Sequence, residues 1–137
     1  MRMLRRTLPV VLLIAAPACT TSGDTDLGAD SLTGSAWRLS GVAKETTRPS
    51  AVPTVRFGDD GQLRGDAGCN SFFGTWELDG SRLQIGEVAT TKKLCQPPEV
   101  MEEEAAFLAA LRAGGEIRLG DGELDLLDDE GDVVLEL

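Results

Sequence analysis

Histidine is absent from the 137-residue chain, and cysteine occurs only three times. Without an imidazole the chain cannot form a Ser-His-Asp or Cys-His catalytic arrangement. It also contains no P-loop and no dinucleotide-binding glycine motif. We therefore predict that the protein is not an enzyme and needs no cofactor. Only catalysis by paired carboxylates stays open, because that chemistry requires no histidine.

The sequence gives equally little support for a metal site. There is no histidine ligand and no paired Cys-x-x-Cys motif, so we predict no zinc site. The acidic turn Asp128–Asp132 could attract Ca²⁺, but it lacks the length and the ligand spacing of an EF-hand loop. We expect no bound metal.

Basic residues are scarce, with 13 Lys and Arg against 23 Asp and Glu, for a formal net charge of −10. Arg2, Arg5 and Arg6 lie at the N-terminus, so a chain without that segment keeps 10 basic residues against 23 acidic ones. An acidic surface repels nucleic acid and anionic membranes. We therefore expect neither to be a direct ligand of the folded domain. The length suits one domain.

No hydrophobic run is long enough to cross a membrane, since the stretch Leu8–Ala16 falls far short of the roughly 20 residues required. A basic start, this short apolar run and the small residues after it are typical of a secretory signal peptide, here residues 1–18. Pro9 and Pro17 disfavour the alternative of a buried N-terminal helix. Arg5-Arg6 leaves the twin-arginine export route open beside the general one.

The segment Ala16-Pro17-Ala18-Cys19 resembles a bacterial lipobox, which implies a diacylglycerol on Cys19 and cleavage before it. Residues 19–31 are small, polar and acidic, as expected of a flexible tether between a lipid and a domain. We therefore expect an exported protein, lipid-anchored to the bacterial cell membrane or outer membrane. Its domain would face the periplasm or the exterior.

From residue 32 onward, apolar and polar residues alternate in short runs that predict β-strands. The first predicted strand is Trp37–Ser40 and the last is Val133–Leu137, while Val42–Pro53 is predicted to be a surface loop. Turn residues between paired runs predict three hairpins. These pair Val55–Phe57 with Gln62–Arg64, Trp76–Leu78 with Arg82–Ile85, and Ile117–Leu119 with Glu123–Leu126.

One segment departs from this pattern, because Val100, Phe107, Leu108 and Leu111 recur at helical spacing. Pro97 and Pro98 suit its first turn and Gly114 suits its end. The acidic run Glu102–Glu104 is interpreted as a solvated helix face. The predicted fold is β-rich α+β: a curved, half-barrel-like antiparallel sheet of about seven to eight strands packed on one α-helix.

The stretch Gly65–Trp76 holds three glycines, one cysteine, one asparagine and three of the six aromatic residues. We expect irregular backbone packed against the core there. With Cys19 assigned to lipid, Cys69 and Cys95 remain, and an oxidising compartment favours a disulfide between them. Two separately buried thiols are the alternative. Asn70 is expected to satisfy loop backbone rather than to orient a substrate.

Several segments, in this order, resemble the META domain (HslJ-like) family over about residues 32–137. They are Gly68-Cys69-Asn70, Phe73–Trp76, Leu83 with Gly86, and Ala89–Cys95, followed by the acidic helix and the last strands. The motif positions are Gly68, Cys69, Asn70, Gly74, Thr91 and Cys95. Trp76 stands where the family often has tyrosine.

The resemblance implies a compact β-rich domain on a helix, usually secreted or lipid-anchored in bacteria. Family members are linked with heat-shock response, novobiocin resistance and, in trypanosomatids, motility and secretion. No reaction or agreed ligand is implied. We therefore expect a non-catalytic, monomeric envelope lipoprotein that acts in stress tolerance or binds an envelope protein. The alternative is a carrier that holds a small ligand or lipid between sheet and helix.

Overall fold

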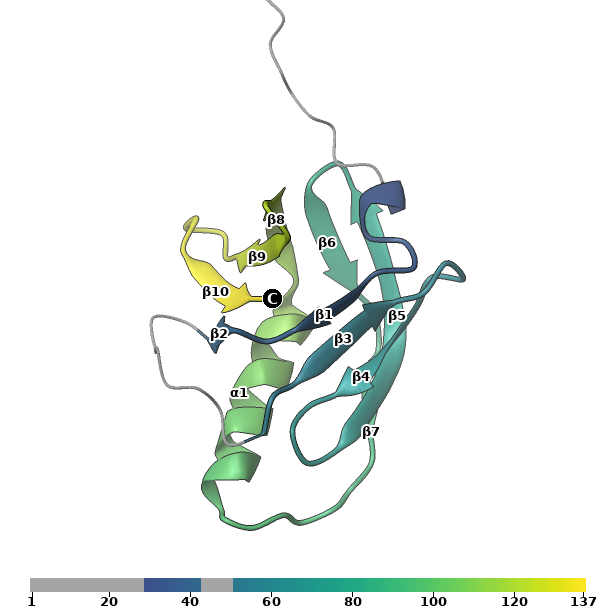
Figure 1. The fold of residues 1–137 in the computed structure, drawn as a ribbon. Helices are drawn as coiled ribbons and strands as arrows, with labels where there is room; N and C mark the ends of the chain where they lie inside the picture. The colour runs from purple at the N-terminus through teal and green to yellow at the C-terminus, as the bar shows by residue number, and fades with distance from the viewer. Residues whose placement is uncertain (1–28, 43–50) are drawn as a thin grey trace, which may run out of the picture.

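Ten strands form one antiparallel sheet that curls into a half-barrel beside a single helix, in a computed structural model that describes residues 29–42 and 51–137 (Figure 1). The elements are η1 (Ala29–Ser31), β1 (Ala36–Arg38), β2 (Gly41–Val42), β3 (Thr54–Phe57), β4 (Gln62–Asp66), β5 (Ser71–Asp79), β6 (Arg82–Ile85), β7 (Ala89–Thr90), α1 (Glu99–Ala113), β8 (Gly115–Gly120), β9 (Glu123–Leu127) and β10 (Val133–Glu136). The predicted fold class is confirmed. Among the described residues, no helix is long and apolar enough to cross a membrane.

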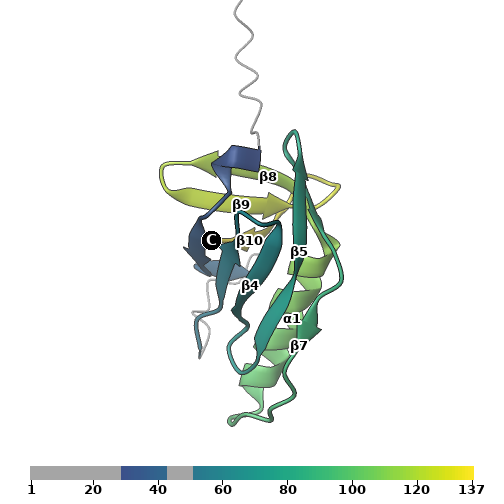
Figure 2. The ribbon, with the colours of Figure 1, turned by 90° about the vertical axis from the view of Figure 1, so that its right-hand side faces the viewer.

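The strand order is β1-β3-β4-β5-β6-β8-β9-β10-β2, with β7 added on β5. The strands at the two ends of this order, β1 and β2, are consecutive in the sequence. β1 pairs with β3, whereas β2 pairs with β10. Ser40, between them, donates its backbone N–H to Glu136. The N-terminal segment therefore bridges both ends of the sheet. Figure 2 shows β8 and β9 running across the direction of β4 and β5, so the sheet turns sharply between its halves.

The three predicted hairpins are present as β3–β4, β5–β6 and β8–β9. The sheet has ten strands rather than seven or eight. The two strands without a sequence prediction, β2 and β7, are two residues long. Two residues cannot show alternation, so their extended backbone depends on pairing with distant strands. Gly41 and Val42 extend this pairing to the start of the segment predicted as a loop.

The expectation of irregular backbone across Gly65–Trp76 is wrong for most of that stretch. Nine residues, Ser71–Asp79, form the longest strand of the sheet, and its residues alternate between exposed and buried. Only the connection between β4 and β5 is irregular. Gly65 lies opposite Phe72 in the ladder, and a Cβ there would come within 2.6 Å of the phenyl ring. The glycine therefore makes room for an aromatic ring within a regular sheet.

Helix α1 presents the predicted apolar stripe to the sheet, with Val100, Phe107, Leu108 and Leu111 all buried. The rings of Phe107 and Phe72 lie 5.9 Å apart and belong to one hydrophobic core. Burial of this stripe is the main stabilising contribution of the helix, because apolar area is removed from water on both layers. The helix ends at Gly114, which has a φ of 63° and donates its N–H to Leu111.

Candidate functional site

The turn that joins β4 to β5 carries the Gly-Cys-Asn motif and is the centre of the candidate site. Ala67 donates its N–H to the carbonyl of Asn70 across 2.8 Å, which closes the turn. Gly68 adopts a φ of 115°, a conformation that residues with a Cβ rarely accept. Its N–H is held by Asp66 Oδ1 at 2.9 Å. Glycine is therefore favoured at position 68 by the backbone conformation of the turn.

A disulfide joins Cys69, in this turn, to Cys95 on the segment that leads into α1, with a Cα–Cα distance of 5.9 Å. The predicted pairing is confirmed. The bond closes a loop of 26 residues in sequence and links the centre of the sheet to the entrance of the helix. Cys19, the predicted lipidation site, lies outside the described residues.

Asn70 is 2% exposed, and its side-chain amide makes four hydrogen bonds. Nδ2 donates to Glu104 Oε1 at 2.8 Å and to the carbonyl of Lys93 at 3.1 Å. Oδ1 accepts from Thr91 Oγ1 at 2.8 Å and from the N–H of Lys93 at 2.6 Å. Both donors and both acceptor positions of the amide are therefore used inside the protein. This agrees with the predicted structural role of Asn70.

Glu104 is the acidic partner of this amide, and its burial corrects the interpretation of Glu102–Glu104 as a solvated face. Glu104 is only 6% exposed. Its Oε2 accepts the backbone N–H of Cys69 at 3.0 Å and that of Asn70 at 2.6 Å. Glu102 is exposed as predicted, while Glu103 is half-buried. Glu104 follows Val100 by four residues and precedes Phe107 by three, so its place on the apolar stripe was a signal of burial.

Burial alone would raise the pKa of the Glu104 carboxyl, because desolvation disfavours its charged form. The hydrogen bonds from the Asn70 side chain and from the Asn70 and Cys69 backbones outweigh that cost, and Lys93 adds a favourable charge. The net result is a pKa below its usual value. Glu104 is therefore ionised at neutral pH and acts as a charged acceptor that ties α1 to the turn.

Two further motif residues belong to the same structural unit. Thr91 Oγ1, besides donating to Asn70, accepts the N–H of Ser71 at 3.2 Å, and Thr91 N–H bonds to the Ser71 carbonyl at 3.0 Å. Gly74 lies further along β5, where a Cβ would come within 2.7 Å of the Glu87 carbonyl oxygen. The motif therefore shapes one polar cluster, consisting of Asn70, Glu104, Thr91 and the disulfide. It also allows one close approach, between β5 at Gly74 and the connection from β6 to β7 at Glu87.

The polar cluster is suited to holding elements together rather than to binding a substrate. Its amide and carboxylate have partners within the protein, and among the described residues no buried side-chain nitrogen or oxygen lacks one. A general base must reach a proton of the substrate, whereas Glu104 is 6% exposed and both of its oxygens accept hydrogen bonds from the protein. The acidic group Asp128, Glu130 and Asp132 forms a turn in which Asp128 Oδ1 accepts two backbone N–H groups.

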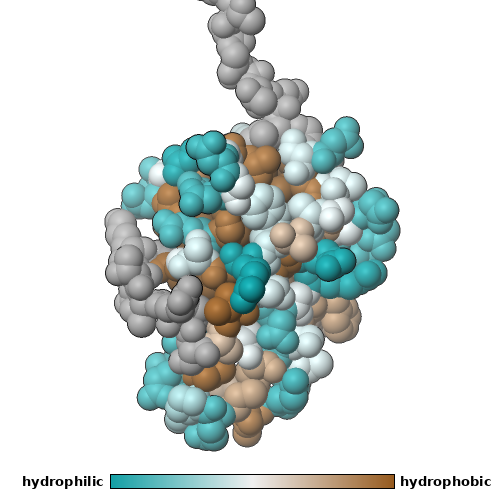
Figure 3. Space-filling model, in the orientation of Figure 1, coloured by the Kyte–Doolittle hydropathy of each residue, from teal (hydrophilic) through white to brown (hydrophobic). Residues whose placement is uncertain are grey.

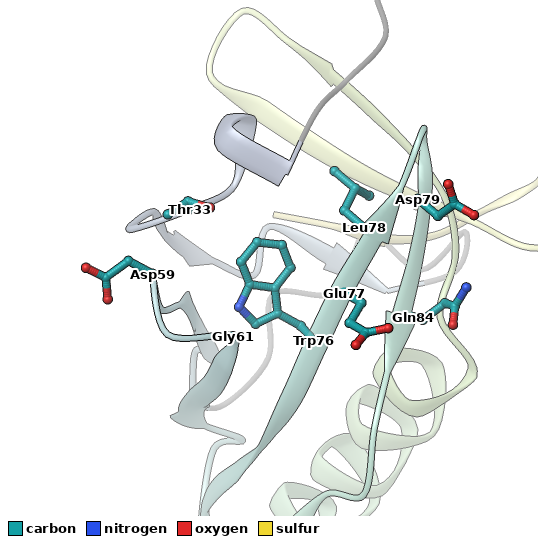
Figure 4. Close-up of a pocket in the computed structure, with 8 residues that line it drawn as sticks. All are labelled: Thr33, Asp59, Gly61, Trp76, Glu77, Leu78, Asp79 and Gln84. Atoms are coloured by element: carbon teal, nitrogen blue, oxygen red, sulfur yellow. The ribbon is translucent and has the colours of Figure 1, made fainter.

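Near one end of β5, an open groove of about 580 Å³ lies beside Trp76 (Figure 4). Asp59, Glu77 and Asp79 give its rim an acidic character. The indole itself is almost fully buried, packs edge-on against Phe57 at 5.3 Å and donates Nε1–H to the Gly58 carbonyl. Trp76 is thus primarily a core residue, and three of the eight residues that line the groove carry carboxylates.

The domain is a half-barrel of antiparallel strands packed on one helix. A disulfide and a buried Asn–Glu pair join the sheet to that helix. The chain belongs to the META domain family, whose family model matches residues 30–137. This family is not a known enzyme family. No curated protein matches the chain.

Two solved structures share the fold. One NMR structure has a TM-score of 0.62 and 21% sequence identity, and the match covers 78% of this chain and 91% of that one. The NMR structure of a protein from Burkholderia xenovorans has a TM-score of 0.61 and 21% identity, with 96% of this chain and 97% of that chain covered. At this level of identity, the likeness shows the fold alone.

Proposed function

We propose that the protein is a non-catalytic envelope lipoprotein whose META domain is an interaction module in stress tolerance, exported and held at the membrane by lipid on Cys19. The observation that supports this proposal most directly is how the three cysteines are distributed between a disulfide and the N-terminal segment. Cys69 and Cys95 bond to each other, which leaves Cys19 as the remaining cysteine of the chain. It follows an apolar run and small residues, as an acylated cysteine should.

The disulfide supports export, since such bonds persist in oxidising compartments and are rare in the reducing cytosol. A lipoprotein with two or three acyl chains on one cysteine would be anchored stably, whereas one chain alone binds weakly. The ten residues from Cys19 to the start of η1 at Ala29 would form the connection to the domain.

A non-catalytic role is supported by the saturated polar cluster and by the lack of histidine in the chain. The residues that carry the family motif are occupied with holding α1 to the sheet. An interaction role is favoured over the carrier because the described sheet–helix interface is filled by side chains. Phe107 and Leu111 are completely buried there, and Phe72 is 2% exposed.

Palmitate labelling of the full-length chain in a bacterial host tests the anchor. The wild type should incorporate label and run at the size of the processed chain. Cys19→Ser should take up no label and accumulate as precursor or soluble product. Ser31→Ala, at the exposed last residue of η1, is the matched control and should label like the wild type. Equal labelling of Cys19→Ser and the wild type would rule the anchor out.

Mass spectrometry of the native protein separates the interaction role from the carrier. An interaction module should copurify without a stoichiometric small molecule, and an affinity pull-down of the anchored form should enrich an envelope protein reproducibly. A stoichiometric apolar ligand released on denaturation would instead establish the carrier.

A further inference from the structure

Three arginines from neighbouring strands share the outer face of one half of the sheet. Arg38 on β1, Arg56 on β3 and Arg64 on β4 are all exposed. Arg56 lies directly opposite Arg64 in the ladder, while Arg38 pairs with Thr54, two residues before Arg56. Direct neighbours across strands are about 5 Å apart and diagonal ones about 7–8 Å. The three side chains line one groove of about 400 Å³.

The arginine face, defined as Arg38, Arg56 and Arg64, has few ion pairs within the part of the chain that the structure describes. Like charges directly opposite each other destabilise a sheet, so the Arg56–Arg64 pair needs an explanation beyond folding. No ion pair joins Arg38 or Arg56 to another described residue, and Arg64 has a long, exposed contact of 3.4 Å with Asp60. Asp66 on β4 shares the face, so the three strands present three arginines against one carboxylate there.

The other half of the sheet has the opposite character. Its arginines are paired: Arg82 lies 2.9 Å from Asp129, and Arg118 lies 2.7 Å from Asp125. Acidic residues crowd β8, β9, β10 and their turns: Glu116, Asp121, Glu123, Asp125, Asp128, Asp129, Glu130, Asp132 and Glu136. The net charge of −10 is therefore distributed unevenly. Salt screens charges that are more than about 8 Å apart, so an anionic surface in contact with the arginine face is attracted by the arginines more than it is repelled by the distant acidic half.

An exposed aromatic residue continues the same row of side chains. Phe73 on β5 lies directly opposite Arg64 and is 56% exposed, which is unusual for a phenyl ring. Figure 3 shows strongly hydrophilic residues over the middle of the face formed by β1, β3 and β4, with hydrophobic ones beside them. Cationic groups flanked by an exposed aromatic ring are the combination by which proteins bind the interface of an anionic bilayer.

We propose that the arginine face, with Phe73, docks the domain onto the anionic phospholipid surface of the membrane that holds its lipid anchor. The inference rests on the proposed acylation of Cys19. The ten residues 19–28, between the lipid and the start of η1, span at most about 33–36 Å when extended, so the domain stays close to the headgroups. That tether makes docking intramolecular and raises the effective concentration of the surface. The guanidinium groups contact lipid phosphates, and the acidic half faces away.

Arginine footprinting with phenylglyoxal tests this proposal on the acylated full-length mature protein. The protein is reconstituted in vesicles of phosphatidylcholine alone or of equal parts phosphatidylcholine and phosphatidylglycerol. Modification of Arg56 and Arg64 should fall several-fold in the anionic vesicles, and high salt should remove this protection. Arg112, an exposed arginine in the last turn of α1, is the internal control and should react equally in both.

A double variant, Arg56→Gln with Arg64→Gln, should abolish the protection of Arg38, whereas Arg112→Gln should leave it intact. Equal reactivity of the arginine face in neutral and anionic vesicles would overturn the proposal. Protection that occurs only in native envelope preparations, and not in lipid vesicles, would assign the face to an acidic protein and overturn it too.

Failure of the anchor is a separate result, read from palmitate labelling. If Cys19 carries no lipid, the exported chain as isolated is mixed with the same vesicles and floated on a density gradient. Flotation with anionic vesicles but not with neutral ones would then support docking without an anchor. No flotation with either would reject it.

Discussion

Replacing Glu104 by alanine removes the acceptor that joins α1 to the β4–β5 turn. Three N–H groups lose their partner at once: the backbone N–H groups of Cys69 and Asn70, and the side-chain amide of Asn70. Asn70 is 2% exposed and Cys69 is 5% exposed, so water has little access to replace the carboxylate. The variant therefore leaves buried donors unsatisfied in the middle of the domain.

Hydrogen bonds to a charged group contribute about 1.5–3 kcal/mol each, and a buried donor that is left without its acceptor costs about 1–3 kcal/mol. Taking the carboxylate out also removes its own desolvation cost, so the three bonds do not add in full. Because three buried donors lose their acceptor, we expect Glu104→Ala to lower the free energy of unfolding by about 3–5 kcal/mol. Urea denaturation, with the midpoint and the slope both fitted, measures this difference.

Glu102→Ala is the matched control, because Glu102 is exposed and lies two residues earlier on the same helix. It should change the free energy of unfolding by less than about 1 kcal/mol, through its favourable interaction with the helix N-terminus. A loss below about 1 kcal/mol for Glu104→Ala, or equal losses for the two variants, would show that the buried carboxylate does not hold the helix.

The remaining predictions concern pH, packing, glycine and the disulfide. The folded-state pKa of Glu104 is lowered, so its contribution to stability is full above the usual value of 4.5 and disappears as pH falls through the folded pKa. On acidification, the free energy of unfolding should therefore fall less steeply for Glu104→Gln than for the wild type. Leu108→Ala should cost about 2–5 kcal/mol in chemical denaturation, since Leu108 is buried in the core. Gly74→Ala should lower the thermal midpoint by the equivalent of about 1–3 kcal/mol, because its Cβ would meet the backbone of Glu87. Reduction should cost up to about 3–4 kcal/mol for the 26-residue loop while the circular dichroism spectrum at room temperature stays native; two thiols titrated before reduction would disprove the Cys69–Cys95 bond.

The sequence patterns predicted an element correctly where the residues of that element alone show its periodicity. The hairpins around the turns at Gly61, Gly80 and Gly122 were predicted because alternation and turn residues agree locally. The apolar stripe of α1 was predicted for the same reason. In contrast, β2 and β7 are extended only because distant strands pair with them, and a two-residue strand has no period of its own.

Glu104 was misassigned because an acidic run near a helix start has an adequate explanation in the helix dipole. The run hides the fact that Glu104, unlike Glu102, shares a face with Val100 and Phe107. Its partner Asn70 lies 34 residues away, and a single sequence does not show that these two residues meet. The pattern could therefore predict the helix and its buried face, but not the buried ion that the face carries.

Net charge was similarly incomplete as a guide to the surface. The excess of acidic residues predicts repulsion from anionic membranes for the molecule as a whole. The pairing of β1 with β3 brings Arg38, which lies outside the predicted hairpins, onto the face that Arg56 and Arg64 share within one hairpin. Charge that is segregated by strand register is visible only once the register is known.

Whether the protein is an anchored lipoprotein can be read from its intact mass after isolation from bacterial envelopes. We expect a chain that begins at Cys19 and carries acyl chains there. Its mass should be lower than that of the reduced chain by two hydrogen atoms, as one disulfide requires, and should show no adduct elsewhere. Alkylation without reduction should leave that mass unchanged. An unacylated chain, or one that begins at any other residue, would contradict the assignment as an anchored lipoprotein.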